Sequence, residues 1–408
     1  MVRLSLDKGG GKIKQHMLLI VLLFGIVLIG LGAVSAVNSA TMNGTSNVTL
    51  NKTLNNSVHT TSTNASRVTK QSVSPMKGYW MFSSSAAKLN PNSAAALKKQ
   101  GITDVFVCTR DINGKYHYSE LKNAISQLNK YGIKVHAWLV CFNYNGHFVN
   151  PSGYYSKKVK VYVKTTKYWG IKSKYKVKKK SWYKSWYIYR GKWHYKWKYT
   201  WKYVTKYKKG WIYKPVYKYV TKTGYDTSYN KKLIAAIKNI NDNYAVSGIH
   251  LDYVRYSGVA KYGNAAYQQP GGVNAAVNAV TEFVKSVRSV VTKKLSAAVM
   301  PEGASNAYYY GQDYGRLADY LDFIVPMTYQ GNYNANNAWI TDKIKYIVSK
   351  AKGKPVYAGL TTYCSDCNLK SLSLNALQQD VNSANDGGAS GFVLFRYGFG
   401  CSYVPTWA

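Results

Sequence analysis

The stretch Gly248-Ile-His-Leu-Asp-Tyr-Val-Arg-Tyr256 begins as a short apolar run and ends in a carboxylate, a cation and two aromatic rings. A short apolar run of this kind is typical of a strand that is buried on both faces of a parallel sheet. The segment Leu295-Ser-Ala-Ala-Val-Met-Pro-Glu302 repeats the design with a second acid. Together they predict two parallel strands that deliver two carboxylates to the same edge of a sheet.

Six further apolar runs, separated by helical patterns, extend this unit along the chain. Eight alternating β and α segments within residues 76–408 predict an α/β fold, a (β/α)8 TIM barrel with an antiparallel β insertion after the third strand. A doubly wound open sheet is the alternative, but no Gly-rich phosphate loop follows any run. The runs are 78–82, 104–108, 134–140, 248–252, 295–299, 322–327, 355–360 and 391–397. The expected helices include 119–131, 231–244, 274–294, 341–352 and 374–385.

The first 37 residues have the pattern of an export segment, because basic residues precede an almost unbroken apolar stretch from Met17 to Val37. That stretch is long enough to cross a bilayer, and small residues near its end offer cleavage sites. Residues 1–37 are therefore predicted to be either a cleaved signal peptide or a membrane anchor formed by residues 17–37. Residues 38–75 are rich in Ser, Thr and Asn and are predicted to be a linker.

Residues 151–225 form the basic aromatic insertion. Its central part, 157–222, contains no acid and contributes much of the net charge of +40. Lysines and aromatic residues alternate from Lys196 onward, which predicts strands with one lysine face and one aromatic face. Turns are expected at Arg190-Gly191-Lys192 and at Lys208-Lys209-Gly210, so the insertion is predicted to be a small antiparallel sheet. A lysine face binds polyanions, with an affinity that falls as salt rises.

The active site of a TIM barrel forms at the carboxyl ends of its strands, where Asp252 and Glu302 are placed. Two such acids suit glycoside hydrolysis, in which one carboxylate attacks the sugar or activates water and the other protonates the leaving oxygen. Neither retention nor inversion is favoured by the sequence. The alternatives are an ion pair between Asp252 and Arg255 and a helix-capping role for Glu302. Asp322 opens the sixth run and is expected to cap the opposite end of the barrel.

Aromatic and polar residues on the strands and at their ends are expected to bind the substrate. Aromatic rings pack against the C–H faces of sugars, and arginines at strand ends suit a uronate or sulfate group. His250 is expected to line the barrel interior on the same side as Asp252. A place in the core or in a structural salt bridge is the alternative for each residue. The candidates are Trp80, Asp111, Trp138, Asn143, His250, Tyr253, Arg255, Tyr256, Tyr329, Gln330, Arg396 and Tyr397.

Three of the runs resemble a known family. The motifs are Gly248-Ile-His-Leu-Asp-Tyr-Val-Arg-Tyr256, Asp322-Phe-Ile-Val-Pro-Met-Thr-Tyr329 and Gly391-Phe-Val-Leu-Phe-Arg-Tyr397. In this order they look like a family of glycosyl-hydrolase-like barrels with a Gly-Ile-His-Phe-Asp-Tyr-Ile-Arg-Tyr type strand, which is similar to the wider α-amylase-like barrels. The resemblance covers residues 76–150 and 225–408.

By this resemblance Asp252 takes the role of nucleophile and Glu302 that of general acid, and no metal or organic cofactor is implied. The insertion resembles Lys/Tyr/Trp tracts in surface proteins of archaea with pseudomurein walls. We therefore expect an exported glycoside hydrolase, secreted or membrane-anchored, that acts on an anionic cell-wall or surface polysaccharide, with the pseudomurein glycan as first candidate. The alternative is a non-catalytic protein that binds wall polysaccharide. Export argues against nucleic acid as the partner of the insertion.

The chain has five cysteines, at positions 108, 141, 364, 367 and 401. Cys364-Ser-Asp-Cys367 is half of a possible metal site, but no second CxxC or His pair accompanies it. In an exported protein a local disulfide, or a bridge from this loop to Cys401, is expected instead. Cys108 and Cys141 lie within apolar runs and are expected to be buried.

Overall fold

The computed structural model describes residues 75–407. The predicted export segment at 1–37 and nearly all of the predicted linker at 38–75 lie outside the described residues. No helix between residues 75 and 407 is both long enough and apolar enough to span a membrane. The chain divides into two compact units. Of the described residues, 75–153 and 226–407 belong to one unit, and Tyr154–Tyr225 forms the other.

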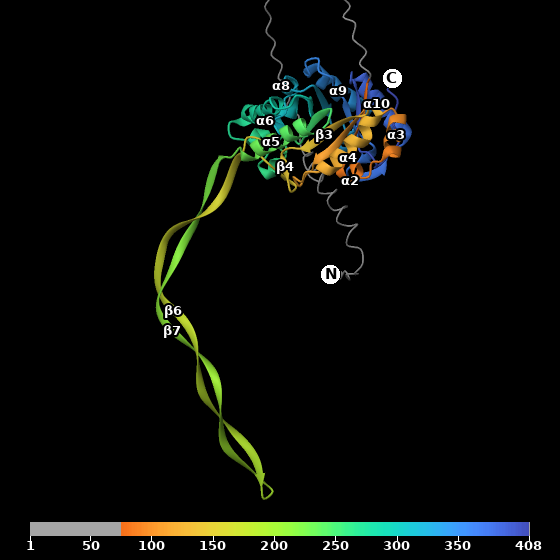
Figure 1. Cartoon of the computed structure of the whole chain (residues 1–408). Coiled ribbons are helices and arrows are strands. Elements are labelled where there is room, and N and C mark those ends of the chain that lie inside the picture. The colour runs from red at the N-terminus through yellow and green to blue at the C-terminus, as the bar shows by residue number, and fades with distance from the viewer. Residues whose placement is uncertain (1–74, 408) are drawn as a thin grey trace, which may run out of the picture. The chain divides into compact units, whose positions relative to one another are not determined.

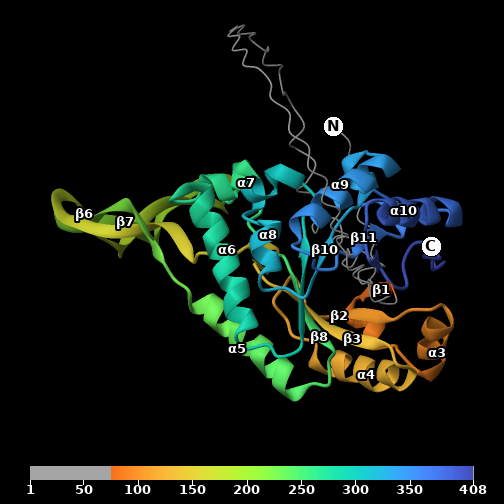
Figure 2. The ribbon, with the colours of Figure 1, turned by 90° about the horizontal axis from the view of Figure 1, so that it is seen from above.

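The first unit is a barrel of eight parallel strands (Figures 1 and 2). The strands are β1 (Met76–Met81), β2 (Asp104–Arg110), β3 (Lys134–Val140), β8 (Gly248–Asp252), β9 (Lys294–Val299), β10 (Phe323–Pro326), β11 (Ala358–Thr361) and β14 (Gly391–Phe395). They pair in the order β10-β9-β8-β3-β2-β1-β14-β11. Isolated parallel bridges from Ile324 to Val356 and from Met327 to Gly359 join β10 to β11 and nearly close the ring. The predicted fold class is confirmed.

Helices surround this ring of strands, as Figure 2 shows from above. Local sequence explains where several begin: the side chains of Asn90, Asn336 and Ser373 accept hydrogen bonds from the first turns of α3, α9 and α10. The stretch 274–294, expected to be one helix, ends as a helix at Arg288 and gives way to β9. The helices are α2 (Ser83–Ala86), α3 (Pro91–Lys99), α4 (Tyr118–Leu128), α5 (Ser228–Asn243), α6 (Gly272–Arg288), α7 (Asn306–Tyr310), α8 (Tyr314–Ala318), α9 (Asn337–Lys350) and α10 (Leu374–Asp386).

The barrel interior is packed with large rings, including Trp80, Phe106 and Phe323. Two histidines are fully or almost fully buried there. His136 contacts Asp104 at 2.8 Å. His250 contacts Ser296 at 2.8 Å through Nδ1 and accepts the Trp80 indole N–H at 3.2 Å through Nε2. Burial lowers the pKa of His250, so it is a neutral ring that carries its hydrogen on Nδ1.

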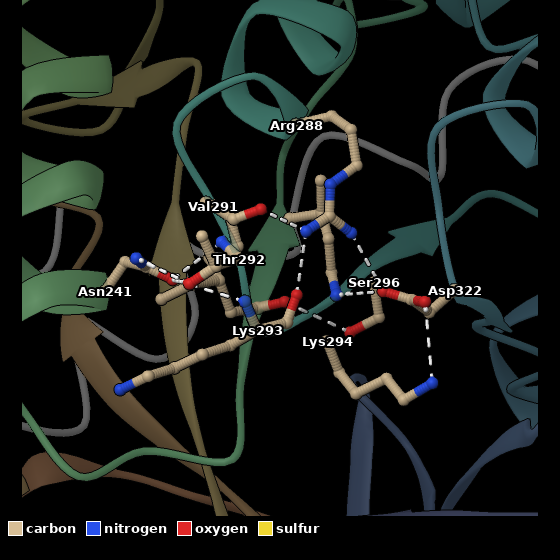
Figure 3. A network of polar contacts seen from close by, with 10 residues as sticks. Asn241, Arg288, Val291, Thr292, Lys293, Lys294, Ser296 and Asp322 are labelled. Carbon is tan, nitrogen blue, oxygen red and sulfur yellow. Dashed lines mark hydrogen bonds and ion pairs between the residues drawn. The ribbon is translucent and has the colours of Figure 1, made fainter.

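Asp322, immediately before β10, ties together the amino ends of two strands (Figure 3). Its Oδ2 accepts hydrogen bonds from Arg288 at 2.9 Å and from the Leu295 backbone N–H at 2.8 Å, and Lys294 lies 3.5 Å from Oδ1. Burial alone would raise the pKa of Asp322, but the N–H of Leu295 and the charges of Lys294 and Arg288 outweigh burial and lower it. The carboxylate therefore stabilises the end of the barrel opposite Asp252.

Asp322→Asn is expected to lower the free energy of unfolding at neutral pH by about 1–2 kcal/mol, because Arg288 and the Leu295 N–H lose an anionic acceptor. The folded-state pKa lies below its ordinary value. The contribution is therefore present above that ordinary value and is lost as the pH falls through the folded pKa. Urea unfolding of parent and variant between neutral pH and about pH 3 should show the difference closing in acid. A difference that does not change with pH would contradict this account.

The second unit is a single two-stranded ribbon, β6 (Tyr154–Tyr189) and β7 (Lys192–Tyr225), whose strands wind around each other (Figure 1). Arg190 and Gly191 form its turn with φ of 47° and 72°, as a two-residue hairpin requires. The turn expected at Lys208–Gly210 is wrong, since these residues lie within β7 and Gly210 pairs with Gly170. The small sheet is therefore one long hairpin.

The expected separation into a lysine face and an aromatic face is also wrong for the ribbon as a whole. It holds along β7, but lysines of β6 lie over β7 rings. The lysine nitrogens are 4.2–4.5 Å from the ring centroids in the pairs Lys160–Tyr217, Lys184–Tyr195, Lys167–Trp211 and Lys180–Tyr199. The pairing strand supplies the other half of each face, and bulges at Tyr162/Lys164 and Ile171/Ser173 change its alternation. Cation–π pairs across the strands therefore help to hold the ribbon.

Candidate active site

Asp252 ends β8 at the carboxyl edge of the barrel, next to β3, and is buried. Its Oδ2 accepts the Trp138 indole N–H at 3.0 Å, and its Oδ1 accepts the Tyr253 backbone N–H at 2.7 Å. Tyr253 has a left-handed backbone (φ 53°), so the chain turns directly after the acid. Because both oxygens accept bonds from N–H groups, the contacts suit an ionised carboxylate.

Burial raises the pKa of Asp252, while the Tyr253 N–H, the Trp138 N–H and the charge of Arg255 act in the opposite direction. The carboxylate is thus removed from water and held mainly by two fixed donors. A group in this position is a stronger base than an Asp in solution, yet its hydrogen bonds still favour the charged form.

Arg255 does not form the ion pair with Asp252 that would tie strand to loop, since no carboxylate of residues 75–407 lies within 4.0 Å of its guanidinium. The side chain is buried and lies 4.9–5.2 Å from the ring centroids of Tyr253, Phe148 and Tyr310. It donates one hydrogen bond to the Tyr256 carbonyl, and its buried Nε–H has no acceptor among the described residues. Arg255 is therefore a caged positive charge close to the acid.

Glu302 follows β9 and is half-buried. It stands at the start of a short 3-10 turn, but its side chain makes no capping bond. Instead its Oε1 accepts the Tyr333 hydroxyl at 2.8 Å. Burial raises the pKa of Tyr310 and Tyr333, Glu302 adds to this effect, and Arg255 opposes it. Glu302 and Arg255 are thus charged neighbours of the same two rings, which brings Glu302 to the side of the site that Arg255 occupies.

A third acid, Asp366, was not predicted from the sequence and lies between β12 (Tyr363–Ser365) and β13 (Asn368–Ser371). Asp366 accepts hydrogen bonds from the Tyr363 hydroxyl at 2.8 Å and from Asn332 Nδ2 at 2.5 Å, and its own N–H donates to Asn332 Oδ1. Burial raises its pKa. Burial raises the pKa of Tyr253 and Tyr329, and the charges of Asp252 and Asp366 both add to this effect, so the four residues are neighbours.

Asp366 lies between Cys364 and Cys367, where the Cys-x-x-Cys spacing favours a disulfide or metal site and gives no sign of a catalytic acid. The expected disulfide is wrong, since all five cysteines are free. No group of three or more His, Cys, Asp or Glu side chains within residues 75–407 is placed to hold a metal ion. Cys108 and Cys141 are buried, as predicted.

Aromatic rings connect these groups at the same end of the barrel. The Trp138 ring lies 5.5 Å from Phe82 and 6.4 Å from Phe395. Phe395 in turn stacks on Tyr329 at 5.7 Å. Trp138, Tyr253, Arg255, Tyr329 and Arg396 are thus the expected binding residues that the structure brings together around Asp252. The rings added by the structure are Phe82, Phe148, Tyr310, Tyr333, Tyr363 and Phe399.

The other expected binding residues have structural contacts instead. Trp80 and His250 bond each other beneath the site, and Tyr256 is fully buried in the core. Asp111 accepts two backbone N–H groups of its own turn and contacts His117, while buried Asn143 accepts a bond from Arg110 through its backbone carbonyl. Gln330 donates to Asp380 of α10. Tyr397 packs edge-on against Tyr79 and lines a separate cavity of about 410 Å³ beside α3.

The sequence matches no protein-family model and no curated protein. Among solved structures it is similar to the glycoside hydrolase domain of PgaB (BpsB) from Bordetella bronchiseptica, with a TM-score of 0.47 and 10% identity over 79% of this chain and 94% of that one. It is also similar to a class V chitinase from Pseudomonas fluorescens Pf-5, with a TM-score of 0.48 and 12% identity over 81% of this chain and 97% of that one. For an endo-β-1,4-mannanase from Thermotoga petrophila the TM-score is 0.46, with 11% identity over 81% of this chain and 73% of that one. The assignment of the fold itself rests on the strand order described above.

Proposed function

We propose that the barrel is a glycoside hydrolase in which Asp252 is the nucleophile or base and Glu302 the general acid. The observation that carries the proposal is Asp252 itself: a buried carboxylate at a strand end, with both oxygens held by N–H donors and with aromatic rings around it. Such fixed donors keep the carboxylate charged and aimed, which attack on a sugar or activation of water requires.

Glu302 complements Asp252 because its contacts leave it free to carry a proton. One of its oxygens accepts the Tyr333 hydroxyl, and no other hydrogen bond to it occurs in the described part of the chain. An acid that protonates a leaving oxygen needs such an open oxygen. The charge of Arg255 acts on Asp252 and on the Tyr333 ring that Glu302 contacts, so it would balance the second negative charge that forms when Glu302 gives up its proton.

The substrate that we propose is an anionic cell-wall or surface polysaccharide, reached by export of the chain, with the pseudomurein glycan as first candidate. The support is the ribbon, which has no acid and exposes lysines and rings along its length. Lysines attract the anionic polymer and rings pack on its sugars, so the ribbon would hold the chain on its substrate.

The test is release of reducing ends from purified wall glycans by the full-length protein, with the Asp252→Asn variant measured beside it. Activity in the parent that is lost in the variant supports the hydrolase. If neither protein cuts the glycans and both sediment with the walls, the second candidate replaces it: a non-catalytic wall-binding protein. The exposed rings and lysines of the ribbon favour that candidate, because they would bind a polymer without any chemistry in the barrel.

The binding role of the ribbon predicts a specific loss when four β7 lysines without ring contacts are changed to Gln. Sedimentation of the full-length protein with walls is expected to weaken, and its dependence on salt to become shallower, because fewer counterions are displaced. The four are Lys198, Lys202, Lys206 and Lys218.

A variant of the barrel with the same change of charge provides the control. It replaces the exposed lysines Lys88, Lys98, Lys99 and Lys130 by Gln. If both variants lose binding equally, net charge alone explains it and the ribbon has no special role.

A further inference from the structure

Arg396 is a half-buried cation that pairs with no carboxylate of the described residues. It directly follows β14, and its guanidinium carbon lies 4.4 Å from the ring centroid of Phe82 and 4.6 Å from that of Phe399. Its backbone N–H donates to Thr362 at 3.3 Å. Within residues 75–407, no carboxylate lies within 4.0 Å of the guanidinium, and no protein group accepts a hydrogen bond from it.

Two other arginines of the barrel show what a structural role looks like in this chain. Arg288 pairs with Asp322, and Arg110 donates to three backbone carbonyls at the end of β3. Arg396 has two rings against its surface and unused N–H donors at its edge. Burial lowers its pKa, yet a guanidinium stays charged in proteins. A cation that is partly removed from water and lacks a partner gains more than a solvated one when an anion arrives.

Arg396 is linked to both Asp252 and Asp366 by short contacts. On one side, Phe82 lies 5.5 Å from Trp138, which donates to Asp252. On the other side, Phe399 lies 5.3 Å from Tyr363, which donates to Asp366. The guanidinium therefore belongs to the same aromatic wall as the proposed reaction centre. A group bound there would be part of a sugar unit seated in the site.

We propose that Arg396 binds the carboxylate of an acidic sugar, a uronic-acid unit of the polysaccharide that the barrel cuts, an inference that rests on the proposed hydrolase function. A planar guanidinium holds a carboxylate through two parallel N–H···O bonds. Phe82 and Phe399 fix the plane of the guanidinium, so its orientation is set before the sugar arrives. The ribbon would then supply general attraction to the polymer, and Arg396 would select the unit that enters the site.

The experiment measures binding of glucuronate and of its uncharged methyl ester by calorimetry, using the full-length protein with Asp252→Asn so that nothing is cut. We expect glucuronate to bind about 10- to 100-fold more tightly than the ester, as charged hydrogen bonds imply. Arg396→Gln should abolish this preference. Arg396→Lys should retain part of it, because the charge remains and the paired geometry is lost.

Lys130→Gln, which removes one positive charge from the exposed surface of the barrel, is the matched control and should leave the preference unchanged. The proposal is overturned if the Asp252→Asn protein shows no preference for glucuronate, or if this protein keeps the preference when Arg396→Gln is added. A preference that is also lost in Lys130→Gln would overturn it too, because general charge would then explain the binding. The binding assay needs no hydrolysis, so the two proposals can fail separately. If the protein cuts no glycan but its preference for glucuronate depends on Arg396, the subsite stands and only the hydrolase proposal fails.

Discussion

Asp252→Asn is expected to reduce the release of reducing ends from wall glycan by about 10³-fold or more. The change removes the negative charge that either attacks the sugar or activates a water molecule. It also forces an amide NH2 toward either Trp138 or the Tyr253 N–H, where a donor would face a donor. We therefore expect the variant to unfold more easily by about 1–3 kcal/mol as well. Initial rates and urea unfolding of the full-length protein measure the two effects.

Two variants provide controls for this result. Asp319→Asn removes an exposed acid that pairs with Lys352 and should leave activity unchanged. Trp138→Phe keeps an aromatic ring at this position but removes one donor to Asp252. Because Asp252 works in its charged form, activity should be lost as the pH falls through its raised pKa, and the variant should lose activity at higher pH than the parent does. Full activity in Asp252→Asn would remove the proposed mechanism.

The barrel was predictable because its strands are buried on both faces. Each strand is then a continuous apolar run, and the alternation of such runs with helical patterns is visible in the sequence. The position of Asp252 followed, since a strand fixes the residue that comes at its end. The alternative role for Asp252, an ion pair with Arg255, is not observed, and the reason cannot be read from the sequence. Arg255 is only three positions away, yet it is enclosed by the neighbouring ring of Tyr253 and by two rings from other parts of the chain, Phe148 and Tyr310.

Residues outside the strands were harder to place. Glu302 and Asp366 take their positions from Tyr333, Asn332 and Tyr363, and these contacts depend on how loops cross the end of the barrel. In the same way, alternation along β7 predicted a strand but not its partner. Gly210 resembles a turn residue until Gly170 is known to lie opposite it. Local pattern sets the type of element, whereas pairing and loop paths depend on contacts between distant residues.

Glu302→Gln is expected to lower activity on wall glycan by about 10²- to 10⁴-fold, the usual contribution of an acid catalyst. A nitrophenyl glycoside of the same sugar should be affected far less, because its leaving group departs without a proton. Comparing the two substrates therefore separates proton donation from all other roles.

Asp366→Asn is the decisive comparison, because Asp366 is a further acid of the site and burial raises its pKa. Both of its oxygens already accept hydrogen bonds, from Tyr363 and from Asn332, so it has no open oxygen to offer a leaving group. We expect a smaller loss that is equal on both substrates, as displacement of a loop would cause. If Asp366→Asn instead spares the nitrophenyl glycoside and Glu302→Gln does not, the general acid is Asp366 and the assignment of Glu302 is wrong. The same two substrates thus decide which loop supplies the second carboxylate.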